Sequence, residues 1–388
     1  MLQIDHIYEF LYQTLFKDFE VWHLYNGVVK EGPINIRDIS VFTQGPNADK
    51  KIFFYDQEPL VPALSNPYIN LFVKPNVDQV LITSEYSQTF DDYSTSNNLK
   101  QLYYFFHGFA ALDWYRGYYA LNYNKTVIKP YKYAFISFNR IISNDRSYRI
   151  YFISQLISHG ILDQGLVSFG VTDTQSDSWQ DEVNNSNTKL SLSAIEHIQQ
   201  YLPAIPNRLI IDYDNIHGSA SANIPRTLPG WWPNNDQPNV DAFWHVVTET
   251  VFYYNKLHLT EKIFKPIVSK QPFMLLAAPG NLAYLRSYGF KTFDGIIDES
   301  YDLIEDSNLR IEAVVDQLAW YCRLSDQEKQ DVIRAAEPII EHNFHHFYGE
   351  FRQIITRELL NNTQTLFKEI NYDDSNIDYD SVYHVLVN

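Results

Sequence analysis

The chain has 388 residues, 45% of them hydrophobic and 16% aromatic, which is ample material for buried cores and enough length for two domains. Thirty basic against 47 acidic residues give a net charge of −17, and this balance argues against broad contact with a nucleic-acid backbone. With Cys322 as the only cysteine and no apolar run near the ~20 residues of a spanning helix, we expect no disulfide, no membrane span and a cytoplasmic location.

The N-terminal part of the chain predicts a first α/β unit. A helical pattern comes first, and three short apolar runs that end in polar residues follow it, at Lys51–Leu60, Val77–Ser87 and Leu99–Phe109. Such runs are typical of strands that are buried on both faces of a parallel sheet. The segment Leu121–Lys132, which contains Pro130, is the best candidate for a linker.

A second series of alternating strands and helices follows the linker. Up to residue 252 the predicted elements are YAFISFNR (strand), RSYRIYFISQLISHG (helix closed by Gly160), GLVSFG (strand), Ser193–Tyr201 (helix), RLIID (strand), the loop NIPRTLPGWWPNNDQPN and FWHVVTETVF (strand). A helix from Thr260, a further strand, a helix in NLAYLRSYGF and a largely helical region after Asp302 complete the chain.

These elements predict an α/β protein with two Rossmann-like lobes that face a cleft, and with C-terminal helices able to cross back. The expected division is an N-terminal lobe over residues 1–127, a second lobe over residues 128–345 and a helical tail over residues 346–388. The chain contains no GxGxxG and no GxxxxGK[ST] motif, so a dinucleotide-binding fold and a P-loop enzyme are both disfavoured.

Glu249 stands near the C-terminal end of a strand that is apolar on both faces. In open α/β sheets ligands bind beyond the carboxyl ends of the strands. A carboxylate there can accept hydrogen bonds from the hydroxyls of a ribose or a sugar. The alternative is a structural ion pair with a neighbouring Arg or Lys, and this residue alone does not separate the two.

Lys262 lies at the unfavourable end of its predicted helix. Thr260 is a good N-cap and Glu261 suits the positive helix end, but a cation in the first turn opposes the helix dipole by about 0.3–1 kcal/mol. An anion in front of the helix would explain the cation, because the helix N–H groups and the ammonium would converge on it. Pro266 is expected to interrupt the helix behind this point. The alternative is that Lys262 reaches solvent or pairs with a carboxylate.

The stretch FWHVVTET…HLTEKIFKPIVSKQPFMLLAAPGNLAYLRSYGFKTF resembles the donor-binding half of α1,3-fucosyltransferase-like glycosyltransferases of the two-lobed GT-B architecture. YAFISFNRIISNDRSYRIYFISQL is similar to the entry of that domain, so the resemblance covers roughly residues 133–302. It departs from the family at Thr250-Val251, where the family has Asn-Ser. The resemblance implies an inverting glycosyltransferase that moves a sugar from a nucleotide sugar such as GDP-fucose to a glycan or other hydroxyl acceptor, with no metal needed for the chemistry.

The resemblance also assigns expected roles to residues of the second lobe. Thr260, Glu261 and Lys262 would form the start of the donor-binding helix, with Glu249 and Glu261 facing sugar and ribose hydroxyls and Lys262 facing the diphosphate. Arg149, or else Arg140 or Arg146, would supply a second phosphate-binding cation.

Inverting transfer needs a base for the acceptor hydroxyl, and the first lobe offers several candidates. Asp56 and Glu58 follow one predicted strand, Glu85 ends the next and His107 ends the third. We group Asp56, Glu58 and Glu85 with Glu249 as candidate catalytic carboxylates. His107, Trp114 and Arg116 are candidate acceptor-binding residues, although for Trp114 and its neighbours the sequence favours a buried core over contact with a sugar.

A metal site is not expected from the sequence. Asp212-Tyr213-Asp214 imitates an Asp-x-Asp metal motif, but Asp378-Tyr379-Asp380 repeats the tripeptide in a polar tail, so we interpret both as chance. The alternative to an enzyme is a non-catalytic binding or structural protein that keeps a glycosyltransferase-like scaffold.

Overall fold

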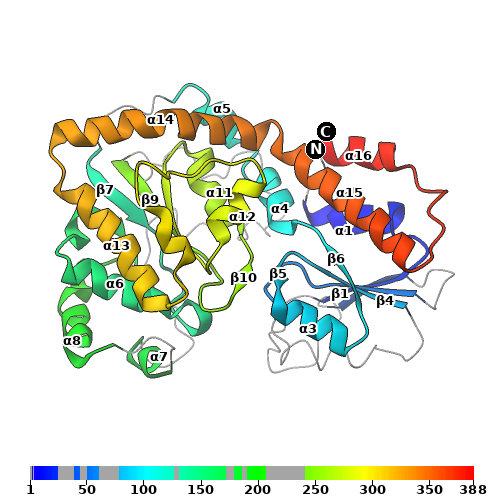
Figure 1. Ribbon diagram of the computed structural model, residues 1–388, viewed down its shortest axis with the longest axis horizontal. Helices are drawn as coiled ribbons and strands as arrows, with labels where there is room; N and C mark the ends of the chain where they lie inside the picture. The colour runs from blue at the N-terminus through cyan, green and yellow to red at the C-terminus, as the bar shows by residue number, and fades with distance from the viewer. Residues whose placement is uncertain are drawn as a thin grey trace. The chain divides into compact units, whose positions relative to one another are not determined.

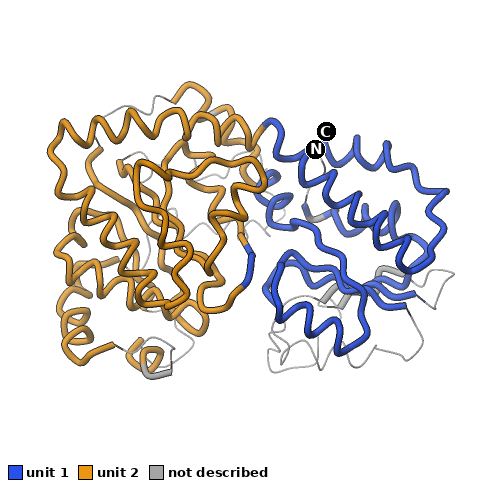
Figure 2. Tube along the Cα trace, viewed as in Figure 1, with its two compact units in different colours: residues 1–113, 256–258, 349–388 blue, residues 114–255, 259–348 orange. Residues whose placement is uncertain are grey.

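The computed structural model describes residues 2, 4–24, 39–43, 50–60, 78–125, 131–171, 179–185, 190–206 and 241–388. They form two compact units, coloured separately in Figure 2. Unit 1 comprises residues 1–113, 256–258 and 349–388, and unit 2 comprises residues 114–255 and 259–348. The expected strand RLIID, the Pro/Gly/Trp-rich loop and residues 126–130 of the expected linker lie outside the described residues.

Unit 1 is built on a five-stranded sheet with the order β2-β1-β3-β4-β6. Strands β1, β3, β4 and β6 are parallel neighbours, and β2 runs antiparallel to β1 at one edge. The three strands expected in the first half are confirmed as β3, β4 and β6. The strands of this unit are β1 (Glu20–Leu24), β2 (Ile39–Thr43), β3 (Lys50–Phe54), β4 (Asp78–Thr83), β5 (Tyr86–Ser87), β6 (Lys100–Tyr103) and β10 (Lys256–Leu257), the last paired antiparallel with β5.

The helices of unit 1 come from both ends of the chain. The last two, α15 and α16, pack on each other, and α15 also packs on β6 (Figure 1). Phe367 of α15 stacks on Phe19 with ring centroids 5.7 Å apart, so the expectation that late helices cross back is confirmed. The helices are the 3-10 turn Ile4–His6, α1 (Ile7–Thr14), α3 (Gln88–Ser96), α4 (Phe106–Trp114), α15 (Phe351–Glu369) and α16 (Tyr379–Val387).

Unit 2 is built on a parallel four-stranded sheet with the order β11-β9-β7-β8. Its strands are β7 (Tyr133–Ser137), β8 (Gly165–Val167), β9 (Ala242–Thr248) and β11 (Phe273–Leu276). All seven residues of β9 are buried, as its apolar faces predict. Among the described strands the chain winds to one side from β7 to β8 and to the other from β9 to β11. The carboxyl ends of β7 and β9 therefore mark a topological switch point, where ligands of such sheets bind.

Helices cover the sheet of unit 2 as an α/β fold requires. Helix α13 packs on β7, β11 and α6, and α11 packs on β9, β11 and α14. The helices are α5 (Tyr118–Asn122), α6 (Tyr148–Ser158), α7 (Trp179–Asn185), α8 (Leu192–Tyr201), α11 (Glu261–Val268), α12 (Asn281–Ser287), α13 (Ser307–Arg323) and α14 (Asp326–Tyr348), with 3-10 turns at Asn144–Arg146, Leu162–Gln164, Leu202–Ala204 and Glu299–Leu303. Across the described residues, no helix has the length and apolar character to cross a bilayer.

Candidate functional site

The end of β9 is held in place by hydrogen bonds from two directions. The Glu249 N–H donates to the carbonyl of Leu276 at 2.9 Å, which continues the pairing with β11. From α6, Arg149 Nη2 donates to the carbonyl of Thr248 at 2.6 Å, and the Tyr148 hydroxyl donates to that of Glu249 at 2.7 Å. These three hydrogen bonds therefore fix the backbone that leads out of the central strand.

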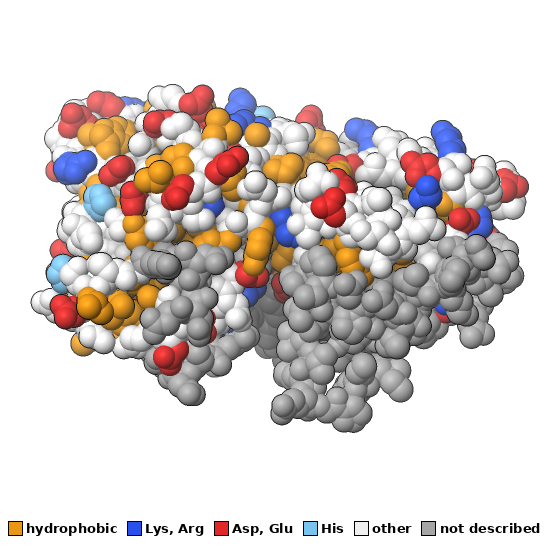
Figure 3. Space-filling model, turned by 60° about the horizontal axis from the view of Figure 1, so that its bottom comes forward, with side chains coloured by type: hydrophobic (Ala, Val, Ile, Leu, Met, Phe, Trp, Pro, Cys, Tyr) orange, Lys and Arg blue, Asp and Glu red, His pale blue; other side chains and the backbone are white. Residues whose placement is uncertain are grey.

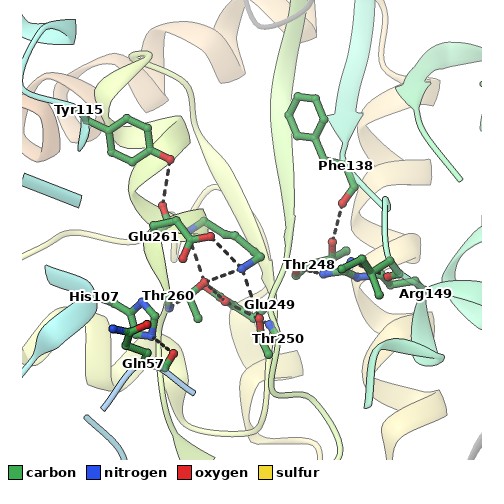
Figure 4. A network of polar contacts seen from close by, with 12 residues as sticks. Gln57, His107, Tyr115, Phe138, Arg149, Thr248, Glu249, Thr250, Thr260 and Glu261 are labelled. Atoms are coloured by element: carbon green, nitrogen blue, oxygen red, sulfur yellow. Dashed lines mark hydrogen bonds and ion pairs between the residues drawn. The ribbon is translucent and has the colours of Figure 1, made fainter. Parts of the chain in front are cut away.

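The carboxylate of Glu249 joins the end of β9 to the start of α11 (Figure 4). The side chain is fully buried, with an exposed fraction of 0%. It accepts hydrogen bonds from the Thr260 N–H at 3.2 Å, the Thr260 hydroxyl at 2.6 Å and the Thr250 N–H at 3.2 Å. We expected this carboxylate to meet either a ligand hydroxyl or a cation, but the hydroxyl that it holds belongs to Thr260.

Helix α11 begins as the sequence predicts. Thr260 is the N-cap in extended backbone, and its hydroxyl accepts a hydrogen bond from the Lys262 N–H at 3.4 Å. Pro266 lies inside the helix and does not interrupt it, because α11 continues to Val268. The apolar side chains of this helix are buried, and they comprise Ile263, Phe264, Ile267 and Val268.

The ammonium of Lys262 lies among three side-chain oxygens at the start of α11. It donates to the Thr260 and Thr250 hydroxyls at 3.1 and 3.3 Å and to Glu261 Oε1 at 3.0 Å. The Lys262 side chain is 35% exposed and that of Glu261 is 16% exposed. The sequence left open whether Lys262 pairs with a carboxylate, and the structure shows this pair with Glu261. Both side chains of the pair are partly exposed to solvent.

The three candidate arginines differ in their surroundings. Arg149 is buried and donates to the backbone carbonyls of Thr248 and Ile141, so its guanidinium fastens α6 to the strand ends. Arg140 and Arg146 are half-buried and lie between β7 and α6, Arg146 in a 3-10 turn. The backbone at Gly170 lies close to the backbone at Arg140, because a Cβ atom at Gly170 would lie 1.6 Å from the Arg140 carbonyl oxygen.

The candidate carboxylates of unit 1 lie at neighbouring strand ends. Asp56 follows β3 and is buried, and its carboxylate accepts a hydrogen bond from the Tyr8 hydroxyl at 3.0 Å. Glu85 follows β4 and forms a buried ion pair with Lys256 at 2.7 Å, while it also accepts the Leu60 N–H at 2.6 Å. Glu58 is half-buried in the turn after β3.

The candidate acceptor residues belong to different units. His107 lies in the first turn of α4 in unit 1, is buried, and bonds through Nε2 to the carbonyl of Gln57 at 2.9 Å. Trp114 ends α4, and both it and Arg116 are half-buried residues of unit 2.

Three residues that contact the candidate site residues were not predicted from the sequence. No role was assigned to Thr250 or Tyr148, although the Thr250 hydroxyl accepts a hydrogen bond from Lys262 and the Tyr148 hydroxyl donates one to the end of β9. His258 contacts His107 in unit 1, with ring centroids 5.2 Å apart. Its only signal was a polar residue between the leucines of KLHLT, two positions before the helix cap.

Among the residues that the structure describes, no three His, Cys, Asp or Glu side chains gather as a possible metal site. Asp212 and Asp214 lie outside those residues, and Asp378 caps α16 by accepting the Ser381 N–H at 3.0 Å. In the view of Figure 3, Lys and Arg side chains of the described residues are scattered among Asp and Glu.

Comparison of the chain with protein-family models, curated proteins and solved structures finds no match. A functional proposal is therefore based on the two groups of candidate residues at strand ends. These are Glu249, Thr260, Glu261 and Lys262 in unit 2 and Asp56, Glu58 and Glu85 in unit 1.

Proposed function

We propose that this chain is an inverting glycosyltransferase of the two-lobed GT-B type, in which unit 2 binds a nucleotide sugar such as GDP-fucose and unit 1 binds a glycan or other hydroxyl acceptor. In the proposed reaction the acceptor oxygen bonds to the anomeric carbon as the bond from that carbon to the diphosphate breaks. The bonding electrons leave with the diphosphate, and a base takes the acceptor proton. The proposal needs no metal ion and includes a cytoplasmic location.

One observation carries the proposal: a partly exposed lysine lies at an α-helix N-terminus beyond the carboxyl end of a central parallel strand. Lys262 is 35% exposed, in the first turn of α11, and follows β9 at the topological switch of the sheet. The helix N-terminus and the ammonium both favour a negative charge at that point. A leaving diphosphate is the anion that glycosyl transfer would place there.

Glu249 supports the same reading in a different role from the one expected. Its carboxylate holds Thr260, and the Thr260 hydroxyl in turn accepts a hydrogen bond from Lys262. Glu249 therefore acts as a positioning residue, because it fixes the helix cap and, through it, the ammonium. Glu261, which is part of the same cluster, is the carboxylate with solvent access that a ribose or sugar hydroxyl can reach.

The ion pair between Lys262 and Glu261 favours the second candidate, a non-catalytic protein that keeps the scaffold. A paired lysine opposes the helix dipole less, so it needs no external anion to explain it. The two candidates differ in what happens when a diphosphate is offered: the enzyme exchanges the Glu261 contact for the phosphate, and the scaffold does not.

A thermal-unfolding panel of nucleotide sugars and nucleoside diphosphates tests the proposal. A ligand at 100 times its Kd should stabilise the protein by about 2.7 kcal/mol. We expect the nucleoside diphosphate and the nucleotide sugar of one base to stabilise the chain. We also expect turnover to release that diphosphate from the sugar donor. A flat response to every nucleotide would support the non-catalytic candidate instead.

A further inference from the structure

Two tyrosines of unit 2 form an exposed aromatic pair on α5. Tyr119 lies in this helix and Tyr123 follows its last residue, so the four-residue spacing puts both rings on one face. The rings are in contact, with centroids 5.2 Å apart and planes at 51°. Tyr119 is 41% exposed and Tyr123 is 49% exposed. Single exposed aromatic side chains are common on protein surfaces, but two in contact form a continuous apolar surface that a ligand can cover.

Helix α14 packs against the Tyr119 ring, and Figure 1 shows the two helices side by side. Phe344 stacks on this ring, with centroids 5.8 Å apart and planes at 9°, and Tyr348 meets it edge-on at 5.1 Å. Tyr348 is itself held, because its hydroxyl donates to the Tyr115 carbonyl at 2.8 Å. The orientation of the Tyr119 ring is therefore set before a ligand binds, which lowers the entropy cost of binding.

Tyr123 is held through its backbone and through a neighbouring histidine. Lys270 Nζ donates to the Tyr123 carbonyl at 3.1 Å and to both carboxylate oxygens of Glu341 at 2.8 and 2.7 Å. His345 meets the Tyr123 ring edge-on with centroids 5.9 Å apart, and its Nε2 lies 3.6 Å from Glu341 Oε2. An exposed imidazole and a half-buried carboxylate therefore lie beside the two exposed rings.

This combination of rings and polar groups fits a neutral sugar ring. One face of a pyranose consists of C–H groups that pack on aromatic rings, and hydroxyls project from its edge. The two tyrosines supply the aromatic surface. Glu341 and His345 supply hydrogen-bonding groups at its rim, because each carboxylate oxygen has lone pairs for more than one donor.

Other kinds of ligand fit the aromatic pair less well. An aromatic site for a cation needs an excess of negative charge or electron-rich ring faces around it, but buried Lys270 already neutralises Glu341 here. A stable protein partner would need about 800 Å² of surface on each side, and two tyrosine rings with a charged rim supply only a fraction of that. A single sugar unit matches the size of the pair.

The aromatic pair is separate from the ligand site proposed at the start of α11. The Tyr115 hydroxyl donates to the carbonyl of Glu261 at 3.4 Å, and Asn122 Nδ2 donates to that of Val268 at 3.0 Å. The segment that contains α5 therefore runs alongside α11 from start to end, which is about 10 Å at 1.5 Å per residue. Tyr123, which follows Asn122, lies at the C-terminal end of α11.

We propose that Tyr119 and Tyr123 bind one sugar unit of a glycan, at a site of unit 2 that is distinct from the nucleotide-sugar site. The rings pack on the C–H face of the sugar, and Glu341 and His345 bind its hydroxyls. This inference goes beyond the proposed glycosyl transfer and does not depend on it. In a glycosyltransferase the site holds the acceptor glycan close to the protein, and in a non-catalytic scaffold it is the binding function itself.

Saturation-transfer NMR and isothermal titration of the full chain test the site. The probes are maltotriose, cellotriose, chitotriose and 2′-fucosyllactose, which are all uncharged. We expect at least one of them to bind the wild type, with the strongest saturation transfer to the C–H protons on one face of a sugar unit. The double variant Tyr119→Ala/Tyr123→Ala should bind that saccharide at least tenfold more weakly, because it lacks both rings.

Three further variants make the result specific. Tyr123→Phe keeps the ring and should retain the affinity within about threefold. Tyr201→Ala removes an exposed tyrosine from α8 of the same unit and should leave the affinity unchanged. Thermal unfolding checks that each variant is folded, and Tyr123→Ala alone decides the test if the loss of Tyr119 disturbs α14. Titration of GDP and UDP into the same samples measures the donor site separately.

The outcomes separate this inference from the proposed function. A saccharide that binds the wild type and the double variant alike would overturn the aromatic site, as would a wild type that binds none of the four. Binding of tetramethylammonium in place of any saccharide would identify a cation site instead, and self-association that only the double variant loses would identify a contact between copies. Nucleotide binding decides the donor site in each case, and its absence beside a retained saccharide site would overturn the proposed transfer alone.

Discussion

Each of the two units has a Lys–Glu pair beside a candidate site residue that follows the carboxyl end of a strand, and these two pairs differ in burial. In unit 1 Lys256 meets Glu85 at 2.7 Å with side chains 5% and 1% exposed, and the ammonium also bonds the carbonyl of Leu60. In unit 2 Lys262 meets Glu261 at 3.0 Å with side chains 35% and 16% exposed. The two lysines are only six positions apart in the chain.

The difference in burial separates a structural pair from one that can exchange partners. Removing one member of a buried pair leaves an uncompensated charge, so such a pair cannot open for a ligand without a large penalty. A pair near the surface contributes little to stability, and its ammonium can move to a better anion at little cost. We therefore interpret Lys256 as a structural residue and propose Lys262 as the ligand-binding one.

Lys256→Met should destabilise the protein more than any other single substitution in these two pairs. It leaves Glu85 buried without its ammonium, and we expect the free energy of unfolding to fall by roughly 3–5 kcal/mol. Urea denaturation of the variant beside Lys262→Met measures the contrast. The addition of Glu85→Gln to Lys256→Met should recover part of the loss. Equal effects of the two lysine substitutions would contradict the comparison.

Asp302 extends the comparison to a carboxylate held by backbone N–H groups. Its carboxylate accepts the Leu282 N–H at the start of α12. Burial raises the pKa of Asp302 from 3.8 to about 6, although the Leu282 and Ala283 N–H groups and Arg286 lower it. Between these two pKa values the folded protein binds the proton more tightly than the unfolded chain does. The stability that this group contributes is therefore present at pH 4 and is lost as the pH rises to 7, by about 3 kcal/mol.

Asp302→Asn should remove this pH dependence. The stability of wild type relative to the variant should fall between pH 4 and pH 7, as measured by urea denaturation at several pH values. Asp298→Asn is the control, because the pKa of that exposed carboxylate is lowered by its bonds to Ser300, so its effect has the opposite sign. A difference between wild type and Asp302→Asn that stays constant over this range would refute the assignment.

Glu249→Gln should have an intermediate effect within unit 2. The amide keeps one oxygen but places an NH₂ group against the donors of Thr260, and we expect a loss of about 1–3 kcal/mol. Glu261→Gln removes a charge from a more exposed site and should change stability by about 0–1 kcal/mol. If denaturation gives the same value for both, Glu249 does not hold the cap.

The sequence predicted the elements around the site better than the directions of its side chains. Buried strands such as β9 and the capped start of α11 follow from local apolar patterns and from Thr260, which act over a few residues. The partner of Glu249 could not be predicted in this way, because Thr260 is eleven positions away and competes with every other donor near the strand end. His258 was missed because only the pairing of β10 with β5 carries it to unit 1.

The smallest expected change in stability belongs to Lys262→Met, and this variant tests the central claim most directly. Isothermal titration of GDP and UDP into wild type, Lys262→Met and the exposed control Lys291→Met compares the affinities at equal ionic strength. The account predicts that one nucleoside diphosphate binds wild type and Lys291→Met alike, and at least tenfold more weakly to Lys262→Met, with stability changed by about 0–1 kcal/mol. Equal affinities for all three proteins, or no binding to any of them, would contradict it.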